Sequence, residues 1–400
     1  MKSGWQTKKL GDLLEVQNGY AFSSKDYSES GHFVMRIGNV QNSFITLTDP
    51  KFISLPANSA LQRFVLSEGD ILVSLTGDVG RVGVIQKKHL PAALNQRVAR
   101  ITIRNSSPAS REFLLFFLYS DLFREVLTGA GHGAAQQNVS TKDLIEIQLP
   151  VPPLAEQQRI VGILDEAFDG IAAAKANAEK NLQNVRSLFE SHLQSVFTQR
   201  GEGWREKRLD EVCTFSSGGT PSKSNSGYWS GEIPWISGRD MKSTQLFDSL
   251  LHISRSAVDE SSTRMAPAGT LLILVRGMGL AHGAQIAELM VPCAFNQDIR
   301  AIHPEPGLIP RYLLFALRDR INSSNNVLSS AAHGTLKIDS DELKRVMIPV
   351  SSRGHQQRVV ATIDSLSEET QRLESIYQRK LAALDNLKKS LLHQAFSGEL

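Results

Sequence analysis

The sequence has very little cysteine and no long apolar run. Its 400 residues include only Cys213 and Cys293, without a CxxC spacing. A disulfide framework is therefore excluded, and a structural zinc site lacks its usual ligands. No stretch approaches the roughly 18 to 20 apolar residues of a membrane helix, and the opening MKSGWQTKKLGD has no apolar core of a secretory signal. We expect a cytoplasmic protein that does not enter a membrane.

The motifs of common enzyme classes are also missing. The chain has no GxxxxGK(S/T) loop for ATP, no NPPY-like or DPPY-like motif for adenine methylation, and neither GxSxG nor HExxH. The glycine-rich GMGLAHG at Gly277–Gly283 lacks the GxGxxG spacing of a dinucleotide loop. We predict a non-catalytic chain that holds no cofactor or metal of its own.

Net charge is nearly absent. The 44 basic and 41 acidic side chains leave a formal charge of +3. A general attraction to nucleic acid is therefore weak, and a polyanionic partner would have to meet local clusters of cations.

The most informative feature of the sequence is an internal repeat. PVPPLAEQQRIVGILD at Pro150–Asp165 returns as PVSSRGHQQRVVATID at Pro349–Asp364, 199 residues later. WQTKKLGDL returns as WREKRLDEV, and LPAALNQRVARI returns as VPCAFNQDIRAI. Matches in one order indicate a tandem duplication. We divide the chain into globular domains at 1–153 and 200–352, each followed by a helix, at 154–199 and 353–400.

The two helical segments carry a narrow apolar seam with 3-4 spacing, which is typical of a coiled coil. The positions in the first copy are Leu164, Ala167, Ile171, Ala174, Ala178, Leu182, Val185 and Phe189. Each helix of about 46 residues would be roughly 69 Å long. Antiparallel pairing of the two helices would bury both seams and place the globular parts at opposite ends of a pseudo-two-fold rod. The alternative is that each helix folds back on its own globular part.

The globular parts are predicted to be mixed α and β. Strand-like runs such as GDILVSL and TLLILV are separated by glycine turns, and an amphipathic helix is expected over Arg111–Leu127. Strands and helices do not alternate regularly enough for a doubly wound sheet. The predicted fold class is α+β, with two tandem globular domains separated by a long antiparallel two-helix coiled coil.

Two related but different domains in one frame suit a reader of a two-part target, as in dimeric DNA-binding proteins. The stretch FSSGGTPSKSNSGYWSGEIPWISGRDM at Phe215–Met241, the later FNQ and the QQRV helix start resemble the specificity subunit of type I restriction-modification systems. The resemblance covers essentially the whole chain. The first domain departs from it, with QNGYAFSS and GHFVMRIGNV at the corresponding places.

The resemblance implies a subunit without catalytic activity. Each target-recognition domain would read one half of an asymmetric, gapped site in double-stranded DNA, and the helices would set the gap. Two methyltransferase (modification) subunits would dock on the chain, joined by two ATP-driven restriction subunits. S-adenosylmethionine, ATP and Mg would then act on those partners.

Several polar residues are candidates for DNA contact, because arginine can fork onto guanine, asparagine onto adenine, and glycine-flanked arginines can position phosphates. The first copy offers Arg36, Asn39, Arg81, His132, Gln136 and Gln137, and the second offers Arg239, Lys242, Arg276, His333 and Lys337. The alternative is that these are solvated loop residues and tight turns.

The helix starts offer a second kind of candidate. Gln157 with Gln158, and Gln356 with Gln357, are polar pairs repeated at the point where each seam begins. They suit a docking surface used twice, which would give two partner copies per chain. An exposed helix face without a partner is the alternative. For the whole chain, two other functions remain open: a two-headed coiled-coil protein adaptor without DNA specificity, or a stand-alone nucleic-acid enzyme.

Overall fold

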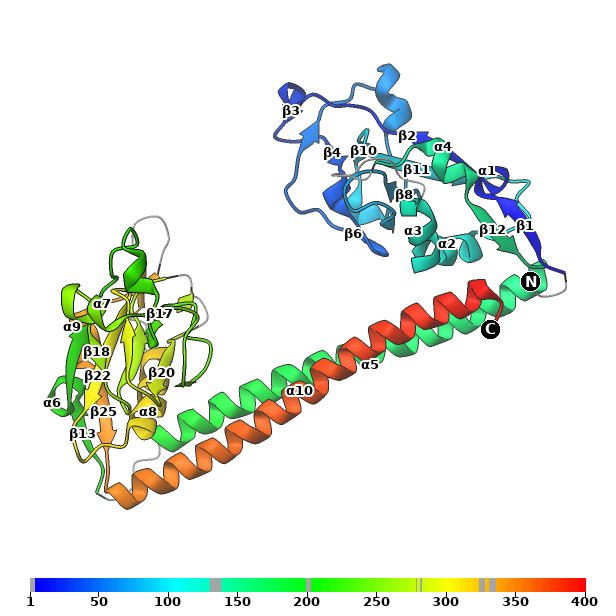
Figure 1. The fold of residues 1–400 in the computed structure, drawn as a ribbon. Helices are drawn as coiled ribbons and strands as arrows, with labels where there is room; N and C mark the ends of the chain where they lie inside the picture. The colour runs from blue at the N-terminus through cyan, green and yellow to red at the C-terminus, as the bar shows by residue number, and fades with distance from the viewer. Residues whose placement is uncertain are drawn as a thin grey trace. The chain divides into compact units, whose positions relative to one another are not determined.

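The structure is a computed structural model that describes residues 4–129, 138–198, 203–277, 279–280, 283–323, 328–330 and 336–400. The chain forms two compact units, Met1–Lys180 with Tyr377–Leu400, and Asn181–Ile376. Each unit contains one globular part and one segment of each long helix (Figure 1).

The first globular part is built from short strands. They are β1 Gln6–Lys9, β2 Leu14–Asn18, β3 Tyr27–Ser28, β4 His32–Met35, β5 Val40–Gln41, β6 Phe44–Ile45, β7 Phe52–Ile53, β8 Ile71–Ser74, β9 Val82–Val84, β10 Ala92–Leu94, β11 Val98–Ile103 and β12 Gln148–Val151. One sheet has the order β2-β11-β8-β9, and a second has the order β10-β4-β7-β3. The run GDILVSL contributes β8, whose four residues are all buried.

The helices of this part are α1 Leu10–Leu13, α2 Arg111–Tyr119, α3 Asp121–Gly129 and α4 Thr141–Glu146. Short 3-10 turns lie at η1 Ser24–Asp26, η2 Ile37–Asn39, η3 Ala60–Phe64 and η4 Lys87–His89. The prediction of a single helix over Arg111–Leu127 is wrong, because the helix is interrupted at Ser120 and continues as a second helix, α3. The Ser120 hydroxyl donates to Phe117 O at 2.6 Å and accepts from Phe123 N at 3.2 Å. Serine competes in this way with the helical hydrogen bonds.

The second globular part repeats this plan with different details. Its strands are β13 Arg205–Arg208, β14 Cys213–Ser217, β15 Ile233–Ile236, β16 Gln245–Leu246, β17 His252–Ile253, β18 Met265–Ala266, β19 Leu271–Leu274, β20 Ile286–Leu289, β21 Cys293–Phe295, β22 Ile299–Pro304, β23 Leu328–Ser330, β24 Leu336–Ile338 and β25 Met347–Val350. The sheets have the orders β14-β22-β19-β20-β16 and β17-β15-β21-β18.

The helices of the second part are α6 Leu209–Val212, α7 Arg255–Glu260, α8 Pro310–Asn322 and α9 Ser340–Arg345, with a 3-10 turn at η5 Ser226–Trp229. Terminal strand pairs show the duplication most directly. Gln6 pairs with Val151 between β1 and β12, and Arg205 pairs with Val350 between β13 and β25, both antiparallel. In each copy this pair leads the chain into a long helix (Figure 1).

The long helices are α5 Leu154–Thr198 and α10 Arg353–Ser397. All eight seam residues of α5 are buried or half-buried, as the spacing predicted. In the first unit Lys175 pairs with Asp385 at 2.7 Å, while Ile160 near the start of α5 lies in one core cluster with Phe396 near the end of α10. The two helices are therefore antiparallel there. None of the described helices is long and apolar enough to cross a membrane.

The end of one copy's helix packs into the other copy's globular part. Phe396 of α10 contacts Phe113 of α2, with ring centroids 5.2 Å apart. In the second unit Phe197 of α5 contacts Tyr312 of α8 at 5.5 Å. In that unit Arg186 of α5 also pairs with Glu374 of α10 at 2.6 Å. Folding back of each helix on its own part alone is thus excluded.

Candidate nucleic-acid interface

A tight turn follows β4 in the first part and β15 in the second. Asn39 Oδ1 accepts from Arg36 N at 3.0 Å, and its Nδ2 donates to Thr48 O at 3.0 Å. Asp240 is the corresponding residue of the second copy, and its carboxylate likewise bonds to the main chain of the turn and of a neighbouring loop. It accepts from Ser237 N at 2.8 Å and from Leu250 N at 2.9 Å. Asn39 is buried, and both polar ends of its amide are bonded to main chain. The expectation that Asn39 reads a base is corrected: it braces the turn.

This turn lies beside the loop that follows the central strand of the main sheet. In the first part a Cβ on Gly77 would be 3.7 Å from Ile37 Cδ1, and in the second a Cβ on Gly238 would be 3.3 Å from Leu274 Cδ1. A third segment joins them through single β-bridges, Thr76 to Asn138 and Arg276 to Lys337. The structure thus brings most of the described DNA-contact candidates to one end of each globular part.

We call these two places the first candidate surface and the second candidate surface. The first is defined by Arg36, Gly38, Gln41, Thr76 and Arg81, and the second by Arg239, Lys242, Arg276 and Lys337. The register of β4 with β10 and of β15 with β21 makes Gly38 the counterpart of Arg239 and Gln41 the counterpart of Lys242. The register of β8 and β19 with their neighbours places Arg276 at the position of Thr76.

The cations of the first candidate surface are already paired. Arg36 Nη2 meets Asp49 Oδ2 at 2.9 Å, and only 28% of the Arg36 side chain is exposed. The Arg36 hydrogen bond, with help from the charge of Lys51, holds the pKa of Asp49 below its usual range. Arg81 Nε lies 2.8 Å from Asp78 Oδ2, and Arg81 Nη1 donates to Gln41 Oε1 at 3.1 Å. Both arginines therefore stabilise the loop structure, in addition to any contact that they make with a ligand.

The cations of the second candidate surface are available. Arg239, Lys242 and Arg276 are exposed, and Lys337 is half-exposed. In the part of the chain that the structure describes, none of these four forms an ion pair with a carboxylate. A cluster of cations without ion-pair partners among the described residues is the arrangement that attracts phosphate. The two copies therefore share a frame but present different chemistry.

Exposed apolar side chains lie beside both turns, and they are not among the candidates predicted from the sequence. Phe44 is 57% exposed and Leu47 42% in the first part, while Phe247 is 63% and Leu250 70% exposed in the second. Because Leu250 N bonds to Asp240, this loop touches the second turn. Apolar contacts of this kind suit a thymine methyl group or a protein partner. Their signal in the sequence is an apolar residue inside a polar loop between two strands.

The glutamine pairs at the helix starts divide into one buried and one exposed member. Gln157 Oε1 accepts from Ser110 N at 2.7 Å, and its Nε2 donates to Pro108 O and Pro152 O, both at 2.8 Å. Gln356 repeats this with Ile309 N at 2.9 Å, Gly307 O at 3.2 Å and Ser351 O at 2.9 Å. Since both are fully buried, their assignment to a docking surface is corrected. Gln158 and Gln357 are exposed and stay candidates.

Four of the candidates, His132, Gln136, Gln137 and His333, lie outside the described residues. No group of three or more metal-binding side chains occurs among the residues that are described. The two thiols are buried and free. Burial, with smaller effects of Glu305 and Asp248, raises the pKa of Cys213 to about 12 and that of Cys293 to about 11. Neither thiol is a nucleophile at neutral pH.

Fold and surfaces together define a class of protein: a duplicated protein with paired long helices and two unlike polar surfaces, in which the described residues form no metal centre. The chain matches the type I restriction modification DNA specificity domain over residues 2–183 and 201–380, and it belongs to that family. The fold class expected from the sequence is confirmed.

Individual relatives agree with this membership. The EcoR124I/EcoR124II specificity subunit of Escherichia coli is 32% identical over 235 residues, which is 57% of each chain. The EcoKI specificity subunit of E. coli K12 is 23% identical over 426 residues, covering 100% of this chain and 90% of the relative. A solved chain from a study of type I R-M system assembly and conformational transition aligns with a TM-score of 0.78 at 21% identity, over 100% of this chain and 99% of the other.

Proposed function

We propose that this chain is the DNA-reading specificity subunit of a type I restriction-modification complex. Each globular part reads one half of a gapped site in double-stranded DNA, and α5 with α10 sets the gap. The chain performs no chemistry itself, and it works in the cytoplasm. Family membership supports this role, as does the placement of the candidate residues at one end of each part.

The observation that carries the proposal is the contrast between two surfaces built on one frame. The same turn is braced by Asn39 in one copy and Asp240 in the other, yet Thr76 is replaced by Arg276 beside it. Equal frames with unlike side chains read unlike sequences, because specificity comes from groups that reach base edges. The recognised site is therefore asymmetric.

The partners follow from the same duplication. Gln158 and Gln357 are exposed at equivalent positions in the first turns of α5 and α10. A repeated face binds a repeated partner, so two modification subunits dock there, and two restriction subunits complete the assembly. S-adenosylmethionine, ATP and Mg act on those subunits.

The test is to map methylated adenines across the genome of the source cell with and without this gene. Loss of one asymmetric, gapped motif on deletion, and its return on complementation, is the expected result. An unchanged map in cells that express the modification subunit would exclude the proposed role.

A further inference from the structure

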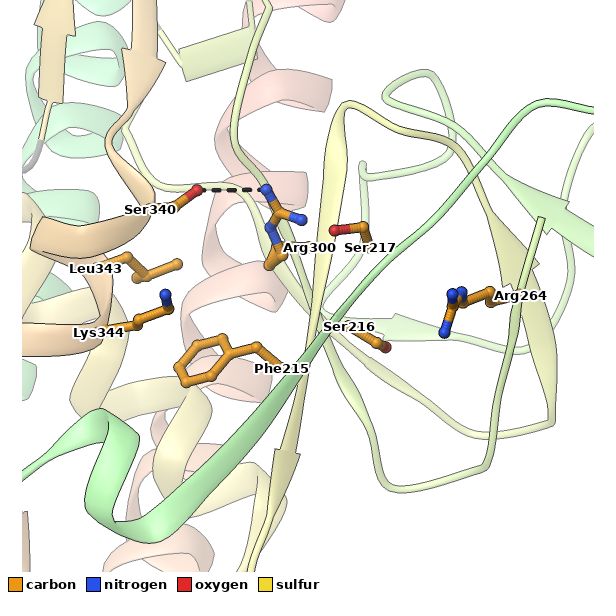
Figure 2. Close-up of a pocket in the computed structure, with 8 residues that line it drawn as sticks. All are labelled: Phe215, Ser216, Ser217, Arg264, Arg300, Ser340, Leu343 and Lys344. Atoms are coloured by element: carbon orange, nitrogen blue, oxygen red, sulfur yellow. Dashed lines mark hydrogen bonds between the residues drawn. The ribbon is translucent and has the colours of Figure 1, made fainter. Parts of the chain in front are cut away.

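A pocket of about 450 Å³ opens in the second globular part where β14, β22 and α9 meet. Figure 2 shows its lining, which includes Phe215, Ser217, Arg300, Ser340, Leu343 and Lys344. Arg264 also lines it, from the segment before β18. Among the described residues that line this pocket there are three cations and no carboxylate.

Arg300 is the central cation of the pocket. It is half-buried, and its Nη2 donates to the Ser340 hydroxyl at 3.3 Å, drawn as a dashed line in Figure 2. It forms no ion pair within the described part of the chain, so its charge is not neutralised. Lys344 adds a second cation. Its Nζ forms an ion pair with Asp341 Oδ1 at 3.2 Å, and its side chain is 43% exposed. Guanidinium, ammonium and hydroxyl donors around one space are the groups that bind phosphate.

Among the described residues of the first globular part, the positions that correspond to Arg300 and Lys344 carry no cation. Arg300 pairs with Ser217 between β22 and β14, and Ala99 pairs with Asn18 at the same point between β11 and β2. Ala99 is therefore the counterpart of Arg300 in the first part. Ala99 is fully buried. Ile145 of α4 takes the position of Lys344 in α9. The pocket chemistry is therefore a property of one copy and does not come from the shared frame.

The pocket lies a few residues along the chain from the second candidate surface. Ser340 follows Lys337 by three residues, a span of at most about 10 Å. Ile338 N donates to Val275 O at 2.9 Å, next to Arg276. On the other side, Arg300 pairs with Ile273 in β19, the strand that leads to Arg276. A polyanion lying on the second candidate surface therefore passes close to the pocket.

We propose that this pocket binds a phosphodiester group of the DNA held by the second candidate surface, so that the second globular part makes a backbone contact that the first does not. This inference rests on the proposed function. It assigns Arg300 the role of a positioning contact, common to cognate and non-cognate DNA, because a phosphate carries no sequence information.

The test measures DNA affinity of the full chain across a range of KCl concentrations, for wild type, Arg300→Ala, Arg300→Lys and Arg345→Ala. Arg300→Ala should weaken binding roughly three- to tenfold near 0.1 M salt and lower the slope of log affinity against log salt by about 0.9. The loss should be equal for cognate and scrambled duplexes. Arg300→Lys keeps the charge and should keep most of the slope.

Arg345→Ala is the matched control. It removes one cation from α9, the helix that borders the pocket, but Arg345 is paired with Glu342 at 2.8 Å and does not line the pocket. An unchanged slope in Arg300→Ala, or a loss confined to cognate DNA, overturns the inference while the proposed function stands. Wild-type binding without sequence preference overturns both. Titration with inorganic phosphate distinguishes a DNA phosphodiester from a free phosphate ion as the ligand of the pocket. If phosphate binding requires Arg300 but the salt slope of DNA binding is unchanged in Arg300→Ala, the pocket binds a free anion. That result would overturn the DNA contact.

Discussion

Gln157 and Ser110 are joined by a buried hydrogen bond of 2.7 Å between the side-chain carbonyl and the main-chain amide. Ser110 caps α2, and Gln157 lies in the first turn of α5. Gln356 makes the corresponding bond to Ile309, which precedes α8. One amide side chain thus fixes the direction in which each long helix leaves its globular part. This brace explains the first glutamine of the repeated QQR motif.

Replacing Gln157 or Gln356 by alanine should lower the free energy of unfolding by about 1–3 kcal/mol, because buried main-chain groups lose their partners. Gln158→Ala and Gln357→Ala are the matched controls, and as exposed changes they should shift it by less than about 0.5 kcal/mol. Urea denaturation followed by circular dichroism measures the difference. Equal effects within each pair would contradict the brace.

Phe396 and Phe197 should be among the most costly residues to truncate. Each is almost fully buried against an aromatic ring of a globular part. Phe396→Ala or Phe197→Ala should destabilise the protein by about 3–5 kcal/mol. Leu188→Ala, at an exposed position of α5, should be nearly neutral. Thermal unfolding of the three variants tests this packing, and a neutral Phe396→Ala would refute it.

The two candidate surfaces should respond differently to loss of an arginine. Arg276→Ala removes an exposed, unpaired cation and should lower the salt slope of DNA binding by about 0.9 with little change in stability. Arg36→Ala leaves Asp49 without its partner and should chiefly loosen the loop after β4. Fluorescence anisotropy against salt, with unfolding curves for both variants, separates the effects. A salt slope that falls in Arg36→Ala but not in Arg276→Ala would reverse this assignment.

Both cysteines should be unreactive in the folded protein. Their raised pKa values, about 12 for Cys213 and about 11 for Cys293, leave very little thiolate at pH 8. Reaction with an aromatic disulfide reagent should be at least about a hundredfold slower than in denaturant. The denatured chain, which should release two equivalents of chromophore, is the control. Rapid reaction of either thiol in the folded state would show that its site is open.

The sequence predicted the long-range plan better than the local surfaces. Helical periodicity and sequence duplication each depend on many residues at once. The apolar seam from Leu164 to Phe189 and the duplicated domain organisation could therefore be recognised from the sequence. Asn39 and Gln157 were misassigned because a polar side chain in a sequence gives no sign of whether main-chain groups surround it. The break at Ser120 depends on one hydroxyl, which helical periodicity does not detect.

The strand register shows that Arg276 corresponds to Thr76, and a threonine in one copy does not indicate an arginine in the other. The exposed Phe247 and Leu250 were missed for a related reason: apolar residues are assigned to the core by default. Functional surfaces are the places where that default fails.

The distance between the half-sites should follow the length of α5, an expectation that rests on the proposed function. Inserting four residues after Glu179, near the middle of α5, lengthens the helix by about 6 Å. Because DNA rises about 3.4 Å per base pair, the unread gap of the methylated motif should grow by one or two pairs while both half-sites stay the same. Four residues rather than five keep the apolar seam nearly in phase with the partner helix. Replacing four exposed residues of α5 without insertion is the control and should leave the gap unaltered. A methylation map of the insertion strain gives the gap directly, and an unchanged gap would mean that the length of α5 does not set it.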